Sequence, residues 1–95
     1  MEYVGSITID KNLIDAVGML PFEKVQVVSN TSGARLETYV IAGEAGSGVI
    51  CMNGACSHLI RKGEEVIIMG YELLEVPSEP KIILIGKNNT IEKYL

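Results

Sequence analysis

The sequence predicts a mainly β fold, a small β-barrel with one or two short helices, formed by residues 1–95 as a single domain. Ninety-five residues leave room for one hydrophobic core. Apolar residues make up 47% of the chain, with one Phe and no Trp, and most are Val, Ile, Leu or Ala. This composition favours strands around a compact core. Six or seven short strand-like segments separated by turns complete the prediction of a barrel.

Strands are expected wherever a short run alternates apolar and polar residues, or is continuously apolar and rich in β-branched residues. In chain order these runs are residues 5–9, 25–29, 35–42, 49–52, 65–74, 81–85 and 90–94. Segments rich in Gly, Asn, Ser or Pro separate the strands and predict turns or loops. The clearest of them are residues 30–33, 43–48, 75–80 and 88–89.

Two short helices are expected between these strands. Asp10 is a candidate N-cap, and the apolar positions after it predict an amphipathic helix over residues 11–20. Gly18 and Pro21 are expected to end this helix, because glycine adopts left-handed C-cap conformations and proline cannot continue the hydrogen-bond ladder. A shorter helical turn is expected over residues 55–61.

The predicted strand over residues 35–42 has two chemically different faces, because side chains alternate along a strand. One face carries Leu36, Thr38 and Val40, and the other carries Arg35, Glu37, Tyr39 and Ile41. Thr38 and Arg35 therefore point in opposite directions. If both served one site, a bulge in the strand or an interface between subunits would be needed.

Charge and hydropathy exclude several classes of function. The formal net charge is −4, and the few basic residues form no patch that would bind nucleic acid or an anionic membrane. No apolar stretch approaches the length of a membrane span, and the first residues lack a signal-peptide pattern. Two cysteines are too few for a disulfide framework. A cytoplasmic protein is expected.

Two patterns in the sequence suggest other kinds of site only weakly. The glycines within residues 43–48 precede a predicted strand, whereas a dinucleotide-binding glycine loop precedes a helix. Cys51, Cys56 and His58 form a C-x4-C-x-H pattern that leaves a small metal-binding module open as an alternative. Structural zinc usually takes four ligands, and the sequence shows no obvious fourth. No metal is therefore expected.

Three motifs follow one another in order: YVGSITID at residues 3–10, RLETYVI at residues 35–41 and NGAC at residues 53–56. Together they resemble the pyruvoyl-dependent aspartate 1-decarboxylases, and the resemblance runs from Tyr3 to about Gly70. It implies a double-psi β-barrel that assembles as a homotetramer, with active sites between neighbouring subunits. It also implies decarboxylation of L-aspartate to β-alanine, a step of pantothenate biosynthesis.

The first motif contains the dipeptide Gly5-Ser6. On its own this dipeptide predicts only a turn. In the family that it resembles, the serine hydroxyl attacks the glycine carbonyl, and the chain is cleaved between the two residues. The resemblance therefore implies that Ser6 is the precursor of a covalent pyruvoyl cofactor. Such a ketone forms a Schiff base with the substrate amine and accepts the electron pair released as CO2 leaves.

The second motif supplies three further residues by the same resemblance. Tyr39 matches a tyrosine that returns a proton to the carbanion carbon. Arg35 is suited to grip a substrate carboxylate with two parallel hydrogen bonds. Thr38 matches a threonine that takes part in self-processing and substrate contact, where its hydroxyl could polarise the Gly5 carbonyl. Without the resemblance, the same residues would predict only packing and solvation.

The third motif matches an Asn-Gly-Ala-Ala segment that lies along the substrate in the family. The resemblance implies substrate contacts from Asn53, Gly54, Ala55 and Cys56. Backbone N–H groups at the start of a helical turn can bind anions without help from side chains. Cys56 replaces the usual alanine, a change between two small residues. A compact acidic substrate suits this segment, and glutamate is not excluded.

In the family that this chain resembles, the chain begins about twenty residues before the position of Met1. That extra segment contributes an edge of the barrel, and its loss would leave backbone groups of the neighbouring strand unpaired. The segment also carries a lysine that helps to hold the substrate, and no lysine here matches it. The gene product is therefore expected to be longer, or the protein to lack part of this machinery. The main alternative is an unprocessed or non-catalytic barrel of the same family that acts as a binding or structural protein.

Overall fold

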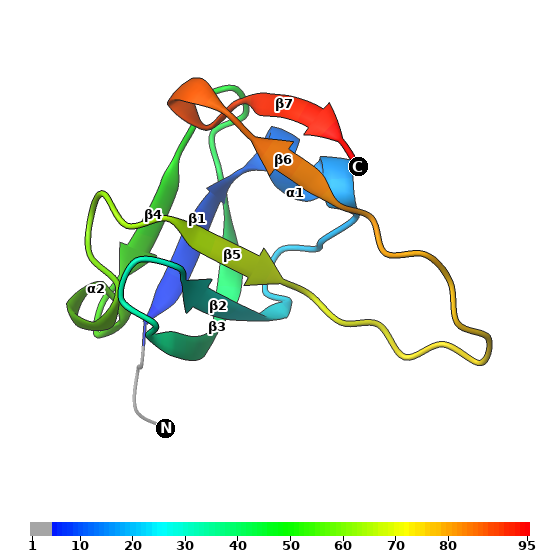
Figure 1. Ribbon diagram of the computed structural model, residues 1–95, viewed down its shortest axis with the longest axis horizontal. Helices are drawn as coiled ribbons and strands as arrows, with labels where there is room; N and C mark the ends of the chain where they lie inside the picture. The colour runs from blue at the N-terminus through cyan, green and yellow to red at the C-terminus, as the bar shows by residue number, and fades with distance from the viewer. Residues whose placement is uncertain (1–4) are drawn as a thin grey trace.

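A computed structural model describes residues 5–95, which form a strongly curled β-sheet with two short α-helices (Figure 1). The elements in chain order are β1 (Ser6–Asp10), α1 (Lys11–Val17), β2 (Lys24–Ser29), β3 (Arg35–Gly43), β4 (Ile50–Asn53), α2 (Cys56–Leu59), β5 (Val66–Met69), β6 (Ile83–Ile85), the 3-10 turn η1 (Lys87–Asn89) and β7 (Ile91–Tyr94). The prediction of a mainly β, small barrel-like fold with one or two short helices is confirmed. Tyr3 and Val4 of the first motif lie outside the described residues.

Strand β1 lies inside the main sheet, whose strand order is β4-β1-β3-β2-β5. It runs parallel to β3, with Ile7 opposite Val40, and antiparallel to β4, with Ser6 opposite Asn53. Parallel neighbours need a long connection, which α1 and β2 provide here. Strands β6 and β7 form a separate two-stranded sheet. The start of β1 is therefore held between two strands that are distant from it in sequence.

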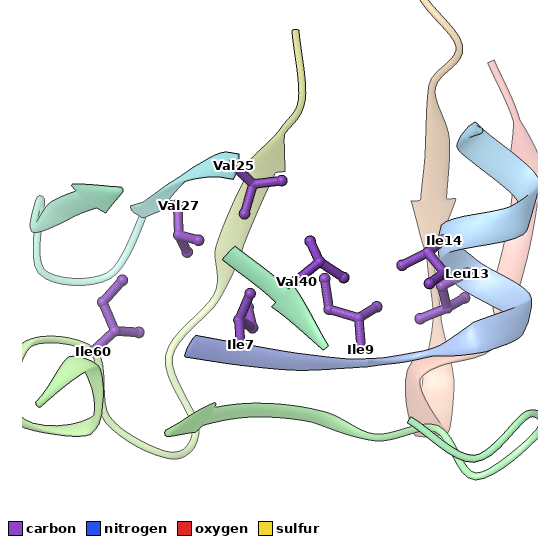
Figure 2. Close-up of a cluster of buried hydrophobic side chains, with 8 residues drawn as sticks. All are labelled: Ile7, Ile9, Leu13, Ile14, Val25, Val27, Val40 and Ile60. Carbon is purple, nitrogen blue, oxygen red and sulfur yellow. The ribbon is translucent and has the colours of Figure 1, made fainter. Parts of the chain in front are cut away.

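One face of β1 builds the hydrophobic core (Figure 2). Its alternation buries the Ile side chains and turns the polar ones to the opposite face, as a period of two requires. The buried apolar cluster consists of Ile7, Ile9, Leu13, Ile14, Val25, Val27, Val40 and Ile60. Side chains from β6 and β7 pack against this cluster, so the C-terminal hairpin covers the part of the core next to α1 (Figure 1). The aliphatic composition thus serves a single core.

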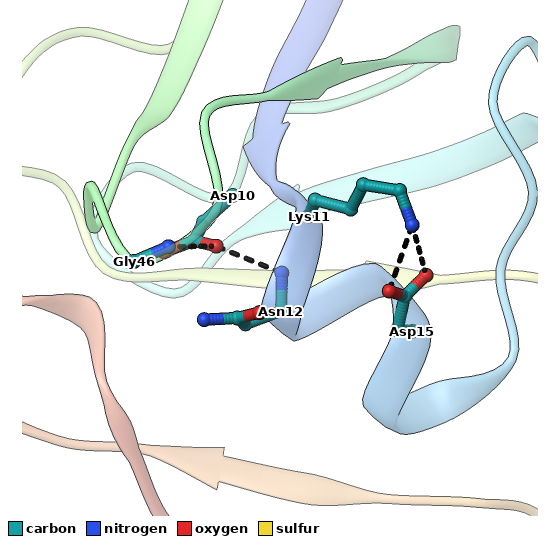
Figure 3. A network of polar contacts seen from close by, with 5 residues as sticks. All are labelled: Asp10, Lys11, Asn12, Asp15 and Gly46. Carbon is teal, nitrogen blue, oxygen red and sulfur yellow. Dashed lines mark hydrogen bonds and ion pairs between the residues drawn. The ribbon is translucent and has the colours of Figure 1, made fainter.

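Helix α1 begins where the sequence predicts it. Asp10 caps it by accepting a hydrogen bond of 2.8 Å from the Asn12 N–H (Figure 3). The same carboxylate accepts hydrogen bonds from the N–H groups of Gly46 (3.0 Å) and Gly48 (2.8 Å). These contacts lower the pKa of Asp10, the largest contribution coming from the Gly48 N–H. One side chain therefore ends a strand, starts a helix and anchors the loop before β4.

Two predicted boundaries were wrong for a local reason. The helix predicted over residues 11–20 ends earlier, at Val17, and Gly18 ends it as expected, because it adopts the left-handed conformation and donates its N–H to carbonyls of the last turn. The helical turn predicted over residues 55–61 is shorter, Cys56–Leu59, because Ile60 already has extended backbone angles. In both cases the backbone conformation of one residue at the C-terminus ends the helix.

The predicted strands at residues 65–74 and 81–85 were too long. Strand β5 stops at Met69, the last residue to pair with β2, opposite Gln26. Residues 70–82 form no strand and extend away from the barrel (yellow to orange in Figure 1). Apolar β-branched residues favour a strand only where a neighbouring strand offers backbone partners, and because β2 begins at Lys24 the residues after Tyr71 have no β2 residue opposite them. Among residues 5–95 no helix has the length and hydropathy to cross a membrane.

Candidate active site

The peptide bond between Gly5 and Ser6 is buried at the start of β1. Ser6 is fully buried and lies opposite Asn53 across the β1–β4 pair. On the other side, the parallel register of β1 with β3 brings Gly5 beside Thr38, because their neighbours two positions on, Ile7 and Val40, are paired. The structure thus assembles these predicted site residues from three strands.

Thr38 contacts the backbone of Gly5 directly. Its hydroxyl donates a hydrogen bond of 2.9 Å to the Gly5 carbonyl oxygen. Thr38 is 6% exposed, so the bond lies in a region with little water. A hydroxyl donor at a carbonyl oxygen makes the carbon more electrophilic and stabilises the negative charge that an attacking nucleophile would create. Polarisation of the Gly5 carbonyl by Thr38 is therefore geometrically available.

Only glycine fits at position 5. Its φ is +108°, a conformation that side-chain-bearing residues rarely adopt. A Cβ atom at this position would overlap the carbonyl oxygen of Asn53 and lie 3.0 Å from the Cys56 sulfur. The close approach of β4 and α2 to the Gly5 backbone therefore requires the absence of a side chain. Backbone in such conformations is commonly found at functional sites.

The amide of Asn53 holds the hydroxyl of Ser6. Its Nδ2 donates a hydrogen bond of 3.0 Å to Ser6 Oγ and a second one of 2.8 Å to Thr8 Oγ1. Sequence reasoning did not single out Thr8. The signal was present, because Ser6 and Thr8 are two positions apart on a predicted strand and so share one face.

Tyr39 and Arg35 lie on the face of the sheet opposite to Thr38. Since Ile7 pairs with Val40, Ser6 neighbours Tyr39 across the β1–β3 pair, and paired side chains share a face. The Tyr39 ring packs against Phe22, with ring centroids 6.4 Å apart. Arg35 is exposed and lies four residues before Tyr39, about 13 Å along the strand. The structure therefore brings Tyr39 close to Ser6 but leaves Arg35 further along the same face.

Residues on opposite faces of β3 can serve one site in this arrangement. Thr38 reaches the backbone carbonyl of Gly5 from the core side, while the side chain of Ser6 projects from the opposite face. A site centred on this peptide bond can therefore use both faces of the sheet. The pairings of β3 with β1 and β2 show no register shift, so the bulge considered from the sequence is not present in this strand.

The third motif forms the turn from β4 into α2. Gly54 has a φ of +59°, and both Gly54 and Ala55 are exposed next to Asn53. Cys56 begins α2, is buried and faces Gly5. The exposed backbone of this turn is accessible to a small molecule, whereas Cys56 packs beneath the Gly5-Ser6 peptide.

Two other features do not coincide with these residues. A surface hollow of about 380 Å³ lies beside β2, and none of the predicted site residues lines it. It is lined by Glu23, Lys24, Val25, Gln26, Glu37 and Tyr71. Among residues 5–95 no group of three or more His, Cys, Asp and Glu side chains could hold a metal ion. Cys51, Cys56 and His58 all lie within that range and form no such group.

Comparison with known proteins yields a consistent set of matches. Residues 1–92 match the family model described as aspartate decarboxylase. An aspartate 1-decarboxylase from Bacillus subtilis (strain 168) is 54% identical over 99 aligned positions, which cover all of this chain and 78% of the relative. Proteins of the same name from Neisseria meningitidis serogroup C and Listeria welshimeri are each 52% identical over 99 positions, with the same coverage.

Proposed function

Because the chain belongs to the aspartate decarboxylase family, we propose that it decarboxylates L-aspartate to β-alanine with a pyruvoyl group made from its own Ser6. The decarboxylase activity follows from relatives of that name at 50–54% identity over the whole chain. The observation that carries the pyruvoyl mechanism is the hydrogen bond of 2.9 Å from the Thr38 hydroxyl to the Gly5 carbonyl oxygen. We further propose that β-alanine production supplies pantothenate biosynthesis.

The proposed processing begins with the Gly5-Ser6 bond. Ser6 Oγ attacks the Gly5 carbonyl carbon, the carbon–nitrogen bond breaks, and the hydroxyl proton passes to the nitrogen, which leaves an ester. Loss of the Ser6 Cα proton and of the Cβ–Oγ bond then releases the upstream segment with a carboxylate at Gly5. The remaining dehydroalanine takes up water and loses ammonia, so that residue 6 becomes an N-terminal pyruvoyl group.

Two contacts and the conformation of Gly5 support this reaction. The Thr38 hydroxyl points at the oxygen on which negative charge develops during attack. The Asn53 amide holds the attacking oxygen of Ser6. Gly5 has no Cβ to obstruct the approach, and its positive φ places the peptide in a conformation that ordinary residues avoid. Donor, nucleophile and carbonyl are thus already together in the folded chain.

The residues around Ser6 also suit the mature cofactor. A pyruvoyl ketone supplies an electrophilic carbonyl that binds the substrate amine and takes up the electron pair left by CO2. We propose that the Asn53 amide orients the carbonyl at position 6, and that the phenol of Tyr39 donates the proton that replaces CO2. The neighbouring position of Tyr39 on β3 supports this assignment.

Substrate binding is proposed for the outer face of the same strands. The Arg35 guanidinium can hold a carboxylate with two hydrogen bonds, and its exposure leaves it accessible. The backbone of Gly54, Ala55 and Cys56 is proposed to line the rest of the substrate. Thr38 lies on the opposite, core face and is 6% exposed, so its proposed contact with the substrate requires the backbone at Gly5-Ser6 to open when the chain is cleaved. L-Aspartate, with two carboxylates on a short chain, fits a site with one arginine and a turn of small residues.

The distance of Arg35 from Ser6 supports an assembled enzyme. About 13 Å separates Arg35 from Tyr39 along the strand, which is long for a substrate the size of aspartate. We propose a homotetramer in which neighbouring subunits complete each site. Exposed apolar side chains such as Phe22, at 76% exposure, and Leu73 offer surface that an interface would bury.

Residues 1–95 are proposed to act as one domain. A cytoplasmic location is proposed as well, and the acidic net charge argues against nucleic-acid and anionic-membrane partners.

The test is the intact mass of the purified full-length gene product before and after prolonged warming. Cleavage should release a piece ending at Gly5 and leave a chain that begins with a pyruvoyl group, and the warmed protein should then convert aspartate to β-alanine. Ser6→Ala, which lacks the nucleophile, should keep its full mass and stay inactive. Full-length mass that persists in the parent protein would contradict the proposal and favour a non-catalytic barrel.

A further inference from the structure

We infer that Thr8 is a positioning residue for self-cleavage, because its hydroxyl holds the Asn53 amide that in turn holds Ser6 Oγ. The inference rests on the proposed cleavage at Gly5-Ser6 and adds a residue that the three motifs do not identify as functional. Thr8 acts through Asn53 and takes no part in bond making or breaking.

The sheet geometry explains how one amide serves two hydroxyls. Ser6 and Thr8 project from the same face of β1, two positions apart. Asn53 lies directly opposite Ser6, whereas the direct partner of Thr8 is Cys51. Asn53 therefore reaches Thr8 along the diagonal of the β1–β4 pair, and its amide nitrogen has two hydrogens to donate. Both are used, one at 3.0 Å and one at 2.8 Å.

Thr8 is held more rigidly than Asn53. Its backbone is paired on both sides, with Ile41 of β3 and Cys51 of β4. Its β-branched side chain also restricts rotation about χ1. Asn53, in contrast, is the last residue of β4 and precedes Gly54 in a left-handed conformation. The terminal torsion of an asparagine is intrinsically broad, so a single hydrogen bond to Ser6 would leave the amide free to rotate.

Through Asn53, the Thr8 hydroxyl affects where Ser6 Oγ lies during the attack on Gly5. Attack requires Ser6 Oγ to stay close to the Gly5 carbonyl carbon, and small displacements of a nucleophile slow such reactions strongly. With the Thr8 hydroxyl in place, the Asn53 amide has one preferred orientation, and the Ser6 hydroxyl is held in one position. Without it, Asn53 can turn away and withdraw the hydrogen bond that it donates to Ser6 Oγ.

The experiment compares the rate of cleavage, followed by intact mass, in matched variants. Thr8→Val keeps the shape and removes the hydroxyl, and we expect cleavage to slow about tenfold, the scale of one lost hydrogen bond. Thr8→Ser keeps the hydroxyl and should cleave within about twofold of the parent. Thr90→Val removes a hydroxyl that donates a hydrogen bond of 2.8 Å to the Lys87 carbonyl and makes no contact with Ser6, Thr8 or Asn53 among the hydrogen bonds of the described residues, and its rate should match the parent.

A double-mutant cycle tests the route through Asn53. If Thr8 acts only by holding that amide, Thr8→Val should slow an Asn53→Ala protein by less than about twofold. Full additivity of the two effects would overturn the inference.

The outcomes also separate this inference from the proposed function. A parent protein that never cleaves removes both. A parent that cleaves, with Thr8→Val equally fast, overturns the role of Thr8 alone. If Thr8→Val unfolds, Thr8→Ser and Thr8→Ala decide, because both lack the methyl group and differ only in the hydroxyl. Slow cleavage in Thr8→Ala with fast cleavage in Thr8→Ser supports the inference, and equal rates overturn it.

Discussion

The Thr38 hydroxyl donates a hydrogen bond of 2.9 Å to the Gly5 carbonyl oxygen across 33 positions of sequence. The contact exists because β1 and β3 run side by side and parallel, with Ile7 opposite Val40. It joins a side chain of one strand to the backbone of the proposed cleavage site, in a region from which water is largely excluded. A buried donor of this kind has more effect on a developing charge than one in water.

Removal of this donor should block processing more than folding. Thr38→Val keeps the shape of the side chain, so the free energy of unfolding should fall by only about 1–2 kcal/mol. Cleavage should slow by about 100-fold or more, the scale seen when an oxyanion donor is removed. Intact mass over time measures the cleavage, and urea unfolding measures the stability. Thr38→Ser should process, and equal slowing in the Val and Ser variants would contradict the role of the hydroxyl.

Gly5 should tolerate no side chain. Gly5→Ala places a methyl group against the Asn53 carbonyl at a φ of +108°, and the backbone conformation alone should cost about 1–3 kcal/mol. Gly33→Ala is the matched control, because Gly33 also has a positive φ, +81°, but has nothing within 4 Å of a new Cβ. Thermal unfolding should therefore show a clearly larger loss for Gly5→Ala. Equal losses would mean that the close packing around Gly5 is unimportant.

Acid should weaken the fold through Asp10. Hydrogen bonds from three N–H groups, that of Gly48 foremost, lower the pKa of Asp10 below its usual value of 3.8. A lowered pKa means that the folded state binds its proton less readily than the unfolded chain does. The stabilisation is thus complete above the usual value and is lost as the pH falls through the lowered pKa.

Asp10→Asn tests this dependence, because the amide would present a donor where the Gly48 N–H requires an acceptor. The melting temperature should fall at pH 7, and the loss of stability as the pH falls below the usual Asp value of 3.8 should become smaller. Asp15→Asn is the control. Asp15 pairs with Lys11 at 2.8 Å on the exposed side of α1, and such exposed pairs contribute little (Figure 3). An unchanged acid profile in Asp10→Asn would contradict the assignment.

Substitution of Tyr39 should impair decarboxylation without impairing self-cleavage. Tyr39→Phe keeps the ring that packs against Phe22, so folding and cleavage should continue as in the parent. Loss of the phenolic proton donor should lower kcat for aspartate by about 100-fold or more. The assay is β-alanine formation by protein already shown to be cleaved. Impaired cleavage in Tyr39→Phe, or undiminished kcat, would remove the role proposed for this residue.

Much of the fold could be predicted from local patterns. The N-cap at Asp10 and the strand-like runs at residues 5–9, 25–29 and 35–42 depend on neighbours within a few positions, and the structure confirms them. The predicted strand over residues 65–74 was too long, because β2 begins at Lys24 and leaves the residues after Tyr71 without a strand opposite them. The local sequence indicates a preference for the extended conformation. How far a strand extends also depends on where the neighbouring strand that pairs with it begins and ends.

The sequence by itself determined which residues of each strand share a face, since alternation is a property of the chain alone. It also determined, through its three motifs, the family to which the chain belongs. Only the tertiary structure decided that Thr38 meets the Gly5 carbonyl and that the Asn53 amide bridges Ser6 and Thr8. Both depend on the register between β1 and its two neighbours. That register is set by packing of the whole core, and no local pattern specifies it.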